Sequence, residues 1–359
     1  MGKPKPLDFL IVGQGLAGTL LAHFLLRENQ NMKIIDCPHQ GAASKVAAGI
    51  INPITGRRFV KSWRVDELIP FAEKTYREIE SKFGIKFFHQ TNILRSLFSV
   101  KEESDWLART AQTAWQQYTS EKAELGEYET KTRAAFSYAE LTNSAQVEVS
   151  FLVETYRKYL LKKEYLIAEP FDFQELEVKQ EVVLYKNIKA RKLVFCEGFK
   201  LKDNPFFNYL PLTPTKGEIL LVHIPGAKFE KILKHKLYIV PLKNELFWVG
   251  SAYQREFETN TPSEKGLTWL ENCLHDILTV PFEVVSHLAA IRPTVKDRRP
   301  FLGQHPQFPA LTIFNGLGTK GASLGPFFAK QITNYLLGKG GLDKEADIKR
   351  FLPKTGQIR

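Results

Sequence analysis

The chain has 359 residues, of which 43% are hydrophobic and 25% are charged, and its formal net charge is +11. This composition is ordinary for a globular protein, and the length suggests two or three domains of ~150 residues. No stretch approaches the ~18 consecutive apolar residues that span a bilayer, so no membrane span is expected. The positive charge would favour nucleic acid or anionic ligands, but the basic residues are scattered and form no long run.

The first residues, MGKPKPLDFLIVG, run from two lysines directly into an apolar segment without a small-residue cleavage site. We interpret them as the start of a first strand and expect a cytoplasmic protein. The three cysteines, Cys37, Cys196 and Cys273, are widely spaced and form no CxxC pair. They predict neither a disulfide framework nor a zinc site, and no metal is expected.

Residues 8–36, DFLIVGQGLAGTLLAHFLLRENQNMKIID, predict a strand, an amphipathic helix and a second strand. A long loop is expected over residues 43–63, and mostly helices over residues 65–150. Residues 148–164 predict a further helix, followed by a strand-like segment over residues 165–173. Residues 174–199 alternate in polarity and predict a meander that ends on a strand.

The second half of the chain is rich in strand signals, and one helix is expected among them. Strands are predicted within residues 213–226, 236–253 and 282–295, and the helix within residues 261–278. The segment 311–341 then predicts a strand, a glycine-rich turn and a helix, as at the start of the chain. We therefore expect the last segment to complete the first domain, which makes that domain discontinuous.

Three glycines, Gly13, Gly15 and Gly18, fit the G-x-G-x-x-G pattern between the first strand and the first helix. The first glycine allows a tight turn, the second lets a pyrophosphate approach the main chain, and the third lets the helix pack closely. The acid Asp36 ends the second strand and is placed to bind a ribose hydroxyl. The pattern predicts a dinucleotide site that disfavours NADP, but its spacing alone leaves FAD and NAD both open.

Four further stretches resemble the D-amino-acid-oxidase-like family of FAD-dependent oxidoreductases, to which glycine and sarcosine oxidases belong. ASKVAAGIINP (43–53) resembles the small-residue loop under the flavin, and LVFCEGF (193–199) the strand that ends near the pyrophosphate. AEPF (168–171) resembles the segment at the adenine. The block AAIRPTVKDRRPFLGQHPQFPALTIFNGLGTKGASLGP (289–326) resembles an Arg-Pro strand end followed by the closing turn at the flavin. Here Cys196 and Glu197 stand where relatives usually have Ala or Thr.

The resemblance implies an α/β fold, with a Rossmann-like FAD-binding domain and a second α+β substrate domain built on a mixed or antiparallel sheet. The boundaries expected are 1–62, 146–205 and 290–350 for the FAD-binding domain, and 63–145 and 206–289 for the substrate domain. FAD is expected to be bound non-covalently, since no Cys or His lies near the closing turn. The residues expected to bind FAD are Gly13, Gly15, Leu16, Ala17, Gly18, Asp36, Cys37, Ala43, Ser44, Lys45, Ala47, Ala48, Gly49, Asn52, Phe171, Cys196, Glu197, Gly198, Arg292, Gly318, Thr319, Lys320, Gly321, Ala322 and Ser323.

The resemblance assigns catalytic-site roles to Arg292, Tyr253, Tyr238 and Lys320. Arg292 would hold a substrate carboxylate with its planar guanidinium. The alternative interpretation is that Arg292 is a surface arginine that ends a strand. The two tyrosines either cover the face of the flavin or only pack against neighbouring side chains in the core or at its rim. Lys320 either stabilises the reduced flavin or contributes only its main chain.

Three functions follow from these assignments. The favoured function is oxidation of the CH–NH bond of a small carboxylate-bearing amino acid or secondary amine to an imine, with hydride transfer to flavin and with oxygen or a carrier as the electron acceptor. The alternative is a tRNA-modifying flavoenzyme that oxidises a carboxymethylaminomethyl uridine, which would use the positive net charge. A non-enzymatic flavin-binding regulator is the third.

Overall fold

The computed structural model describes residues 6–39 and 41–352. The chain forms two compact units, each assembled from separate segments. The first unit comprises Met1–Ala47, Val149–Thr215 and Ile291–Arg359, and the second comprises Ala48–Glu148 and Lys216–Ala290. The first unit is thus discontinuous, and residues 48–62 fall in the second unit although the sequence analysis assigns them to the FAD-binding domain.

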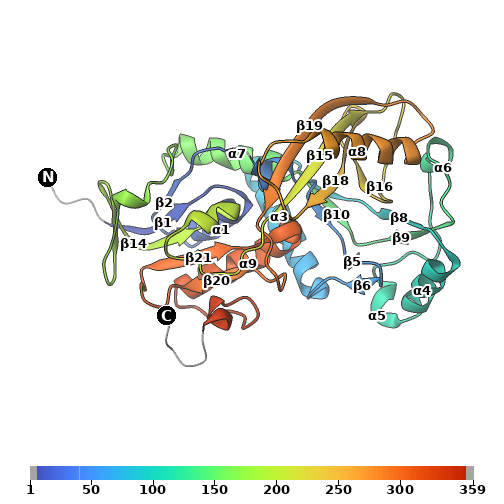
Figure 1. Cartoon of the computed structure of the whole chain (residues 1–359). Coiled ribbons are helices and arrows are strands. Elements are labelled where there is room, and N and C mark those ends of the chain that lie inside the picture. Colours follow the sequence, from blue (N-terminus) through green and yellow to red (C-terminus); the bar gives the residue numbers. More distant parts are fainter. Residues whose placement is uncertain (1–5, 40, 353–359) are drawn as a thin grey trace. The chain divides into compact units, whose positions relative to one another are not determined.

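The first unit is built on a sheet whose central strands are parallel (Figure 1). Strands β11, β2, β1, β14 and β21 follow one another in parallel pairs, and β20 pairs antiparallel with β21. The antiparallel strands β13 and β12 extend the sheet from β14. The strand bounds are β1 Leu7–Val12, β2 Met32–Ile35, β11 Leu166–Ile167, β12 Leu176–Val178, β13 Val183–Tyr185, β14 Ile188–Phe195, β20 Phe301–Gln304 and β21 Leu311–Asn315.

Helices α1 (Leu16–Arg27), α7 (Val149–Lys162) and α9 (Gly321–Leu336) complete this unit, and α1 packs against both others. Close packing of α1 and α9 depends on small residues. A Cβ on Gly325 would lie 2.7 Å from Leu20 Cδ1. The parallel sheet with packed helices confirms the predicted Rossmann-like first part of the fold. Shorter helices are α2 Ala43–Val46, η1 Phe173–Glu175, η2 Gly198–Asp203, η3 Gly318–Lys320 and η4 Ile348–Phe351.

The second unit contains a mixed sheet in the order β19-β15-β18-β17-β16-β8-β9. Most neighbours are antiparallel, whereas β16 and β8 are parallel. A smaller sheet joins β4, β10 and β7, and β5 pairs with β6. The bounds are β4 Ile50–Ile51, β5 Ile54–Thr55, β6 Val60–Lys61, β7 Phe88–Gln90, β8 Ile93–Leu97, β9 Ser137–Leu141, β10 Ala145–Val147, β15 Thr215–His223, β16 Ile232–Lys234, β17 Tyr238–Pro241, β18 Leu246–Gln254 and β19 Glu283–Arg292.

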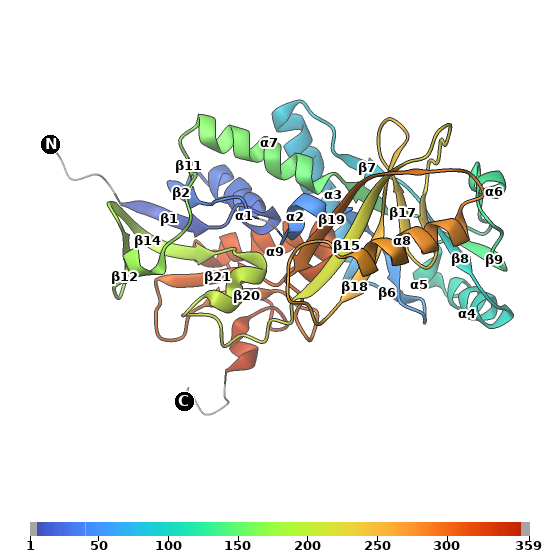
Figure 2. The same cartoon turned by 45° about the horizontal axis from the view of Figure 1, so that its top comes forward.

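Helix α8 (Glu264–Ile277) covers one face of the large sheet of this unit (Figure 2). Its N-cap residue is Ser263, whose hydroxyl accepts the Gly266 N–H, and its apolar residues share a core with the strands. The opposite face carries a second apolar cluster that includes Ile93, Ile232 and Val240. The other helices of the unit are α3 Val65–Phe83, α4 Val100–Thr110, α5 Thr113–Gln116 and α6 Tyr128–Lys131.

Two expectations from the sequence are corrected. Residues 65–150 were expected to be mostly helical, but they also contain the strands β7, β8, β9 and β10. These strands are three to five residues long and lie between helices, so helical periodicity masked them. Within residues 165–173, only Leu166–Ile167 is a strand, because the chain then bends at Glu169 and enters a 3-10 helix at Phe173.

Among the described residues, no helix is long and apolar enough to cross a membrane. The cytoplasmic location stays a prediction.

Candidate functional site

Two positions at the junction of β1 and α1, Gly13 and Gly18, leave no room for a side chain. Gly13 has φ +97°, and a Cβ there would lie 2.6 Å from the carbonyl oxygen of Cys196. A Cβ on Gly18 would lie 1.9 Å from the carbonyl oxygen of Gly13. The turn is therefore so tight that main chain from β1, α1 and the end of β14 is in direct contact.

Helix α1 begins without a side-chain cap. Gly15 is the N-cap residue, and the first turn contains no acid. The Leu16 N–H donates a hydrogen bond of 2.9 Å to the Ser44 hydroxyl, which comes from the predicted flavin loop. A helix N-terminus of this kind offers main-chain N–H groups and partial positive charge to a phosphate.

The carboxylate of Asp36 is held by two groups at the end of β2. One oxygen accepts the Gln14 N–H at 2.9 Å, and the other lies 2.6 Å from Nη1 of Arg157 on α7. The second guanidinium nitrogen of Arg157 donates to the main-chain oxygen of Asp36 at 3.3 Å. Both side chains are partly buried. The predicted ribose-binding acid is therefore fixed in orientation beside the glycine turn.

The end of β14 brings Cys196, Glu197 and Gly198 to the same turn. Cys196 is buried, and its N–H donates to the Val12 carbonyl at 2.7 Å. Burial raises the pKa of the Glu197 carboxyl to about 7, against the effect of Asn204, whose amide donates to it at 2.7 Å. Gly198 has φ +61°, and its carbonyl accepts a hydrogen bond from Asn315 at the end of β21.

The closing turn is connected to the strand end that carries Arg292. The Gly318 N–H donates to the carbonyl of Pro293 at 3.1 Å, and Gly318 has φ +58°. At the start of α9, a Cβ on Gly321 would lie 3.3 Å from Leu16 of the first glycine motif. The first unit therefore brings together Arg292, the closing turn and the N-terminus of α1, which lie far apart in the sequence.

Lys320 is the residue before α9. Burial is the main cause that lowers the pKa of its ammonium, and the charges of Arg298 and Arg299 add to the effect. This ammonium is thus partly buried and has two further cations near it, an environment that an anion would stabilise. Thr319 is exposed and Ala322 is buried.

Other predicted FAD-binding residues take varied positions. Ala43, Ser44 and Lys45 form most of the short helix α2, and Lys45 is exposed. Ala47 follows that helix and is exposed, as is Cys37. Phe171 stacks on Tyr185 with ring centroids 4.6 Å apart and packs against the core of the first unit.

The second unit holds Ala48, Gly49 and Asn52 of the flavin loop together with the two predicted tyrosines. Gly49 has φ +70°, and a Cβ there would lie 1.8 Å from the Val147 carbonyl oxygen. The Asn52 amide donates to the Tyr238 hydroxyl at 3.2 Å, so this loop contacts β17. Tyr253 lies on β18 and is 52% exposed.

Sequence reasoning missed several charged residues near these positions. Arg157 holds Asp36, but it lies on an amphipathic helix where a surface arginine is expected. Arg95 and Lys234 lie in strands beside Tyr238. The sequence contains a pattern that could have singled out Arg95. In the short strand Ile93–Leu97, alternate residues share a face, so Arg95 lies on the same face as the buried Ile93 and Leu97.

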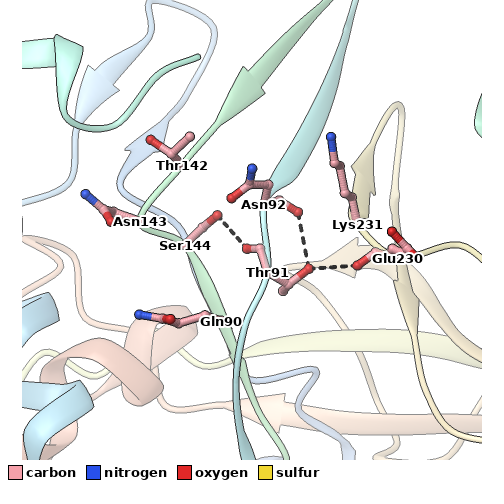
Figure 3. Close-up of a pocket in the computed structure, with 8 residues that line it drawn as sticks. All are labelled: Gln90, Thr91, Asn92, Thr142, Asn143, Ser144, Glu230 and Lys231. Carbon is pink, nitrogen blue, oxygen red and sulfur yellow. Dashed lines mark hydrogen bonds between the residues drawn. The ribbon is translucent and has the colours of Figure 1, made fainter. Parts of the chain in front are cut away.

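A polar pocket in the second unit has no part in this arrangement (Figure 3). The Thr91 hydroxyl donates to the Glu230 carbonyl at 3.1 Å, and the Ser144 hydroxyl donates to the Thr91 carbonyl at 2.7 Å. None of the residues predicted from the sequence lines it. The lining residues are Gln90, Thr91, Asn92, Thr142, Asn143, Ser144, Glu230 and Lys231.

The first unit fits the adenosine and pyrophosphate parts of FAD. It provides an uncapped helix N-terminus, a glycine at the position of closest approach, and a fixed acid at the end of the next strand. Ser44 and the closing turn lie next to that N-terminus. No group of three or more His, Cys, Asp or Glu in the described part of the chain could hold a metal ion.

Comparison with known proteins agrees with this arrangement. Glycine oxidase of Bacillus subtilis is 22% identical over 92% of this chain and 93% of its own length. The structure of iminodiacetate oxidase from Chelativorans sp. BNC1 matches with a TM-score of 0.79 and 19% identity, over 94% of this chain and 98% of that one. The structure of glycine oxidase from Geobacillus kaustophilus matches with a TM-score of 0.78 and 20% identity, over 94% and 96%.

A family model described as DAO, FAD dependent oxidoreductase, matches residues 8–335. This match confirms the resemblance inferred from the motifs, the expectation of an FAD-dependent enzyme and FAD as the cofactor. The structural matches confirm the predicted α/β fold class. The chain therefore belongs to the D-amino-acid-oxidase-like (DAO) family of FAD-dependent oxidoreductases.

Proposed function

We propose that the protein oxidises the CH–NH bond of a small carboxylate-bearing amino acid or secondary amine to an imine. The observation that carries this proposal is the placement of Arg292. Its neighbour Pro293 accepts the Gly318 N–H of the closing turn, so a guanidinium-bearing residue stands beside the predicted flavin contact. The names glycine oxidase and iminodiacetate oxidase both denote amines that carry a carboxylate, which supports the same class of substrate.

Each residue has a limited task in this proposal. Bound FAD supplies the redox chemistry by accepting a hydride equivalent from the substrate carbon. Arg292 binds the substrate carboxylate through two parallel N–H donors, which fixes the orientation of the neighbouring CH–NH bond. The amine nitrogen must be neutral, and its lone pair then stabilises the positive charge that develops on carbon. Tyr238 and Tyr253 shape the substrate face, and Lys320 provides positive charge at the closing turn.

The electron acceptor, oxygen or a carrier, stays open. The tRNA-modifying alternative would use the same carboxylate anchor on a carboxymethylaminomethyl uridine. The relatives reported above do not support it.

The test is substitution of Arg292 in the FAD-loaded enzyme. Removing one partner of a buried charge pair costs about 2–5 kcal/mol, so Arg292→Ala should lower kcat/KM for the best amine about a hundredfold or more. Arg292→Lys should recover part of this loss. Arg191→Ala, at an arginine that is 62% exposed, is the matched control and should change kcat/KM by less than about twofold.

A non-reacting carboxylate separates binding from chemistry. Acetate should perturb the flavin absorption of the wild type and of Arg191→Ala at lower concentrations than in Arg292→Ala. Equal affinities for acetate and equal kcat/KM values in Arg292→Ala and the wild type would refute the assignment.

A further inference from the structure

The polar pocket of the second unit is formed by three segments that lie far apart in the sequence (Figure 3). They are residues 90–92 before β8, residues 142–144 between β9 and β10, and residues 230–231 before β16. The cavity has a volume of about 420 Å³, which is the size of a site for a small molecule. No residue assigned to FAD or to the substrate lines it, so a ligand bound here would be an additional one.

Hydrogen bonds between and within these segments hold the pocket in one shape. The Thr91 hydroxyl donates to the Glu230 carbonyl, and the Ser144 hydroxyl donates to the Thr91 carbonyl. The Thr142 hydroxyl donates to the carbonyl of Gln117 at 3.1 Å. Because each hydroxyl has only one proton, the three hydroxyl groups keep these bonds only if they act as acceptors toward a ligand.

The three amide side chains of the lining are oriented by oxygens that can only accept. Nδ2 of Asn92 donates to the Glu140 carboxylate at 2.6 Å, and Nε2 of Gln90 donates to the Glu73 carboxylate at 3.0 Å. Nδ2 of Asn143 donates to a main-chain carbonyl at 2.8 Å. The nitrogen end of each amide is therefore fixed, and so is its oxygen end. Within residues 6–39 and 41–352, no group donates to the side-chain oxygen of these three amides.

Two charged residues complete the lining, and only one of them is paired. The Lys231 ammonium lies 2.8 Å from the buried Glu140 carboxylate and donates to the main-chain oxygen of Glu124 at 2.8 Å. The Glu230 carboxylate, by contrast, makes no hydrogen bond or ion pair in the part of the chain that the structure describes. Since the Glu124 carboxylate is also 4.0 Å from Lys231, the pocket has three carboxylates and one ammonium, whereas the whole chain has a net charge of +11.

The unused groups of the lining are mostly acceptors: three amide oxygens, three hydroxyl oxygens and one carboxylate. A primary ammonium has three N–H donors, one positive charge and no acceptor, so it matches such a set. Charge-assisted hydrogen bonds to Glu230 would be its strongest contacts. A divalent metal ion fits less well, because the Lys231 ammonium is part of the lining. Among the described residues, no group of three or more His, Cys, Asp or Glu could hold one.

We propose that this pocket binds the primary ammonium group of a small organic amine, with the Glu230 carboxylate as its charge partner. The side-chain oxygens of Asn92 and Asn143 accept the remaining N–H groups. The inference does not rest on the proposed function, because the pocket lies entirely in the second unit and contains none of the residues assigned to oxidation.

The test compares two isomeric cations. tert-Butylammonium and tetramethylammonium have the same atoms and the same charge, but only tert-butylammonium has N–H donors. Neither can be oxidised to an imine, since the first has no C–H bond next to nitrogen and the second has no nitrogen lone pair. Isothermal titration of the FAD-loaded protein should show about tenfold or more tighter binding of tert-butylammonium. Equal affinities, or no binding of either cation, would overturn the proposal.

Potassium distinguishes an ammonium site from a site for any monovalent cation. Potassium chloride should not displace tert-butylammonium at equal concentration, because a bare cation cannot donate hydrogen bonds to the fixed acceptors. Displacement at equal concentration would overturn the assignment to an ammonium group.

Variants locate the binding. Glu230→Gln keeps the shape of an exposed side chain and removes its charge, so it should weaken tert-butylammonium binding about tenfold or more. Glu283→Gln, at an exposed acid of β19 that does not line the pocket, is the matched control and should leave the affinity unchanged. Unchanged affinity in Glu230→Gln would refute the charge partner and with it the proposal.

A second variant tests the acceptors without removing a charge. Asn143 has φ +50°, which glycine adopts readily, so Asn143→Gly should keep the turn while removing one amide oxygen. The affinity for tert-butylammonium should fall about threefold. Arg292→Ala should bind tert-butylammonium as the wild type does. Failure of the proposed function would therefore leave this binding intact, whereas loss of binding in Arg292→Ala would contradict a separate site.

Discussion

The glycine turn of the first unit and the paired cations Arg95 and Lys234 of the second unit are specified by different kinds of physics. At the turn, carbonyl oxygens lie where the Cβ atoms of Gly13 and Gly18 would be, so space selects the residue type. Arg95 and Lys234 occupy paired strand positions, and it is their charge that distinguishes them from their apolar neighbours. Steric requirements of the main chain leave a pattern in the sequence, whereas a charge becomes informative only when the strand register is known.

The largest effect is expected within the glycine turn itself. Gly18→Ala would put a Cβ 1.9 Å from the Gly13 carbonyl oxygen, which cannot move without opening the turn. We expect the free energy of unfolding to fall by about 3 kcal/mol and FAD binding to be lost. In Gly15→Ala the new Cβ meets only the Ser44 hydroxyl, at 3.2 Å.

Gly15→Ala should therefore lower the stability of the FAD-free protein by less than about 1 kcal/mol and weaken FAD binding about tenfold or more. Thermal unfolding without FAD and fluorescence titration with FAD measure the two effects separately. Equal effects of the two substitutions on stability would contradict the distinction between a packing glycine and a ligand-facing glycine.

A smaller effect is expected at the acid that ends β2. Arg157→Met removes the cation 2.6 Å from Asp36 and leaves that carboxylate with the Gln14 N–H. A hydrogen bond to a charged group contributes about 1.5–3 kcal/mol, so we expect a similar loss of stability and about tenfold weaker FAD binding. Lys158→Met, at an exposed neighbour on α7, should change both by little. Unaltered FAD affinity in Arg157→Met would show that Asp36 needs no fixed orientation.

Glu197 gives an effect that depends on pH. Its raised pKa means that the folded state holds a proton that the unfolded state releases at lower pH. Stability should therefore fall as pH rises from about 4.5 to about 7, by at most about 3 kcal/mol. Glu197→Gln should lack this decrease and be more stable than the wild type at pH 8, but not below pH 4.5.

Chemical denaturation from pH 4 to pH 9 measures this effect, and Glu177→Gln at an exposed acid is the control. FAD binding should weaken with rising pH in the wild type more than in Glu197→Gln, since an ionised Glu197 would repel the phosphates. Parallel pH profiles of the wild type and Glu197→Gln would contradict the assignment.

The smallest effect is expected at the cysteines. Cys196 and Cys273 are buried and Cys37 is exposed, and none lies in the closing turn. Cys37→Ser should therefore leave the flavin content unchanged. Acid precipitation of the holoenzyme should release the flavin into the supernatant, and flavin that stays in the pellet would refute non-covalent binding.

The first unit could be predicted well because its constraints are local. Gly13, Gly15, Gly18 and Asp36 lie within one strand-helix-strand segment, and the structure keeps them together. The link between Arg292 and the closing turn was available only through a family resemblance, because long-range contacts have no periodic signal.

The second unit was predicted less well. Strands β7 to β10 are short and lie between helices, so the region was interpreted as helical. Without those strands, Arg95 could not be placed beside Lys234 and Tyr238. Arg157 was missed for a related reason: its partner Asp36 is 121 positions away, and nothing in the helix itself indicates that contact.

The most direct test of the account is the visible spectrum of the anaerobic holoenzyme before and after addition of an amine with and without a carboxylate. Sarcosine and iminodiacetate can be compared with dimethylamine, which has the same secondary amine and no carboxylate. We expect bleaching of the flavin by at least one of the acids and none by dimethylamine at equal concentration. A flavin reduced equally well by dimethylamine, or one that no carboxylate-bearing amine reduces, would contradict the proposal that the enzyme oxidises an amine held by its carboxylate.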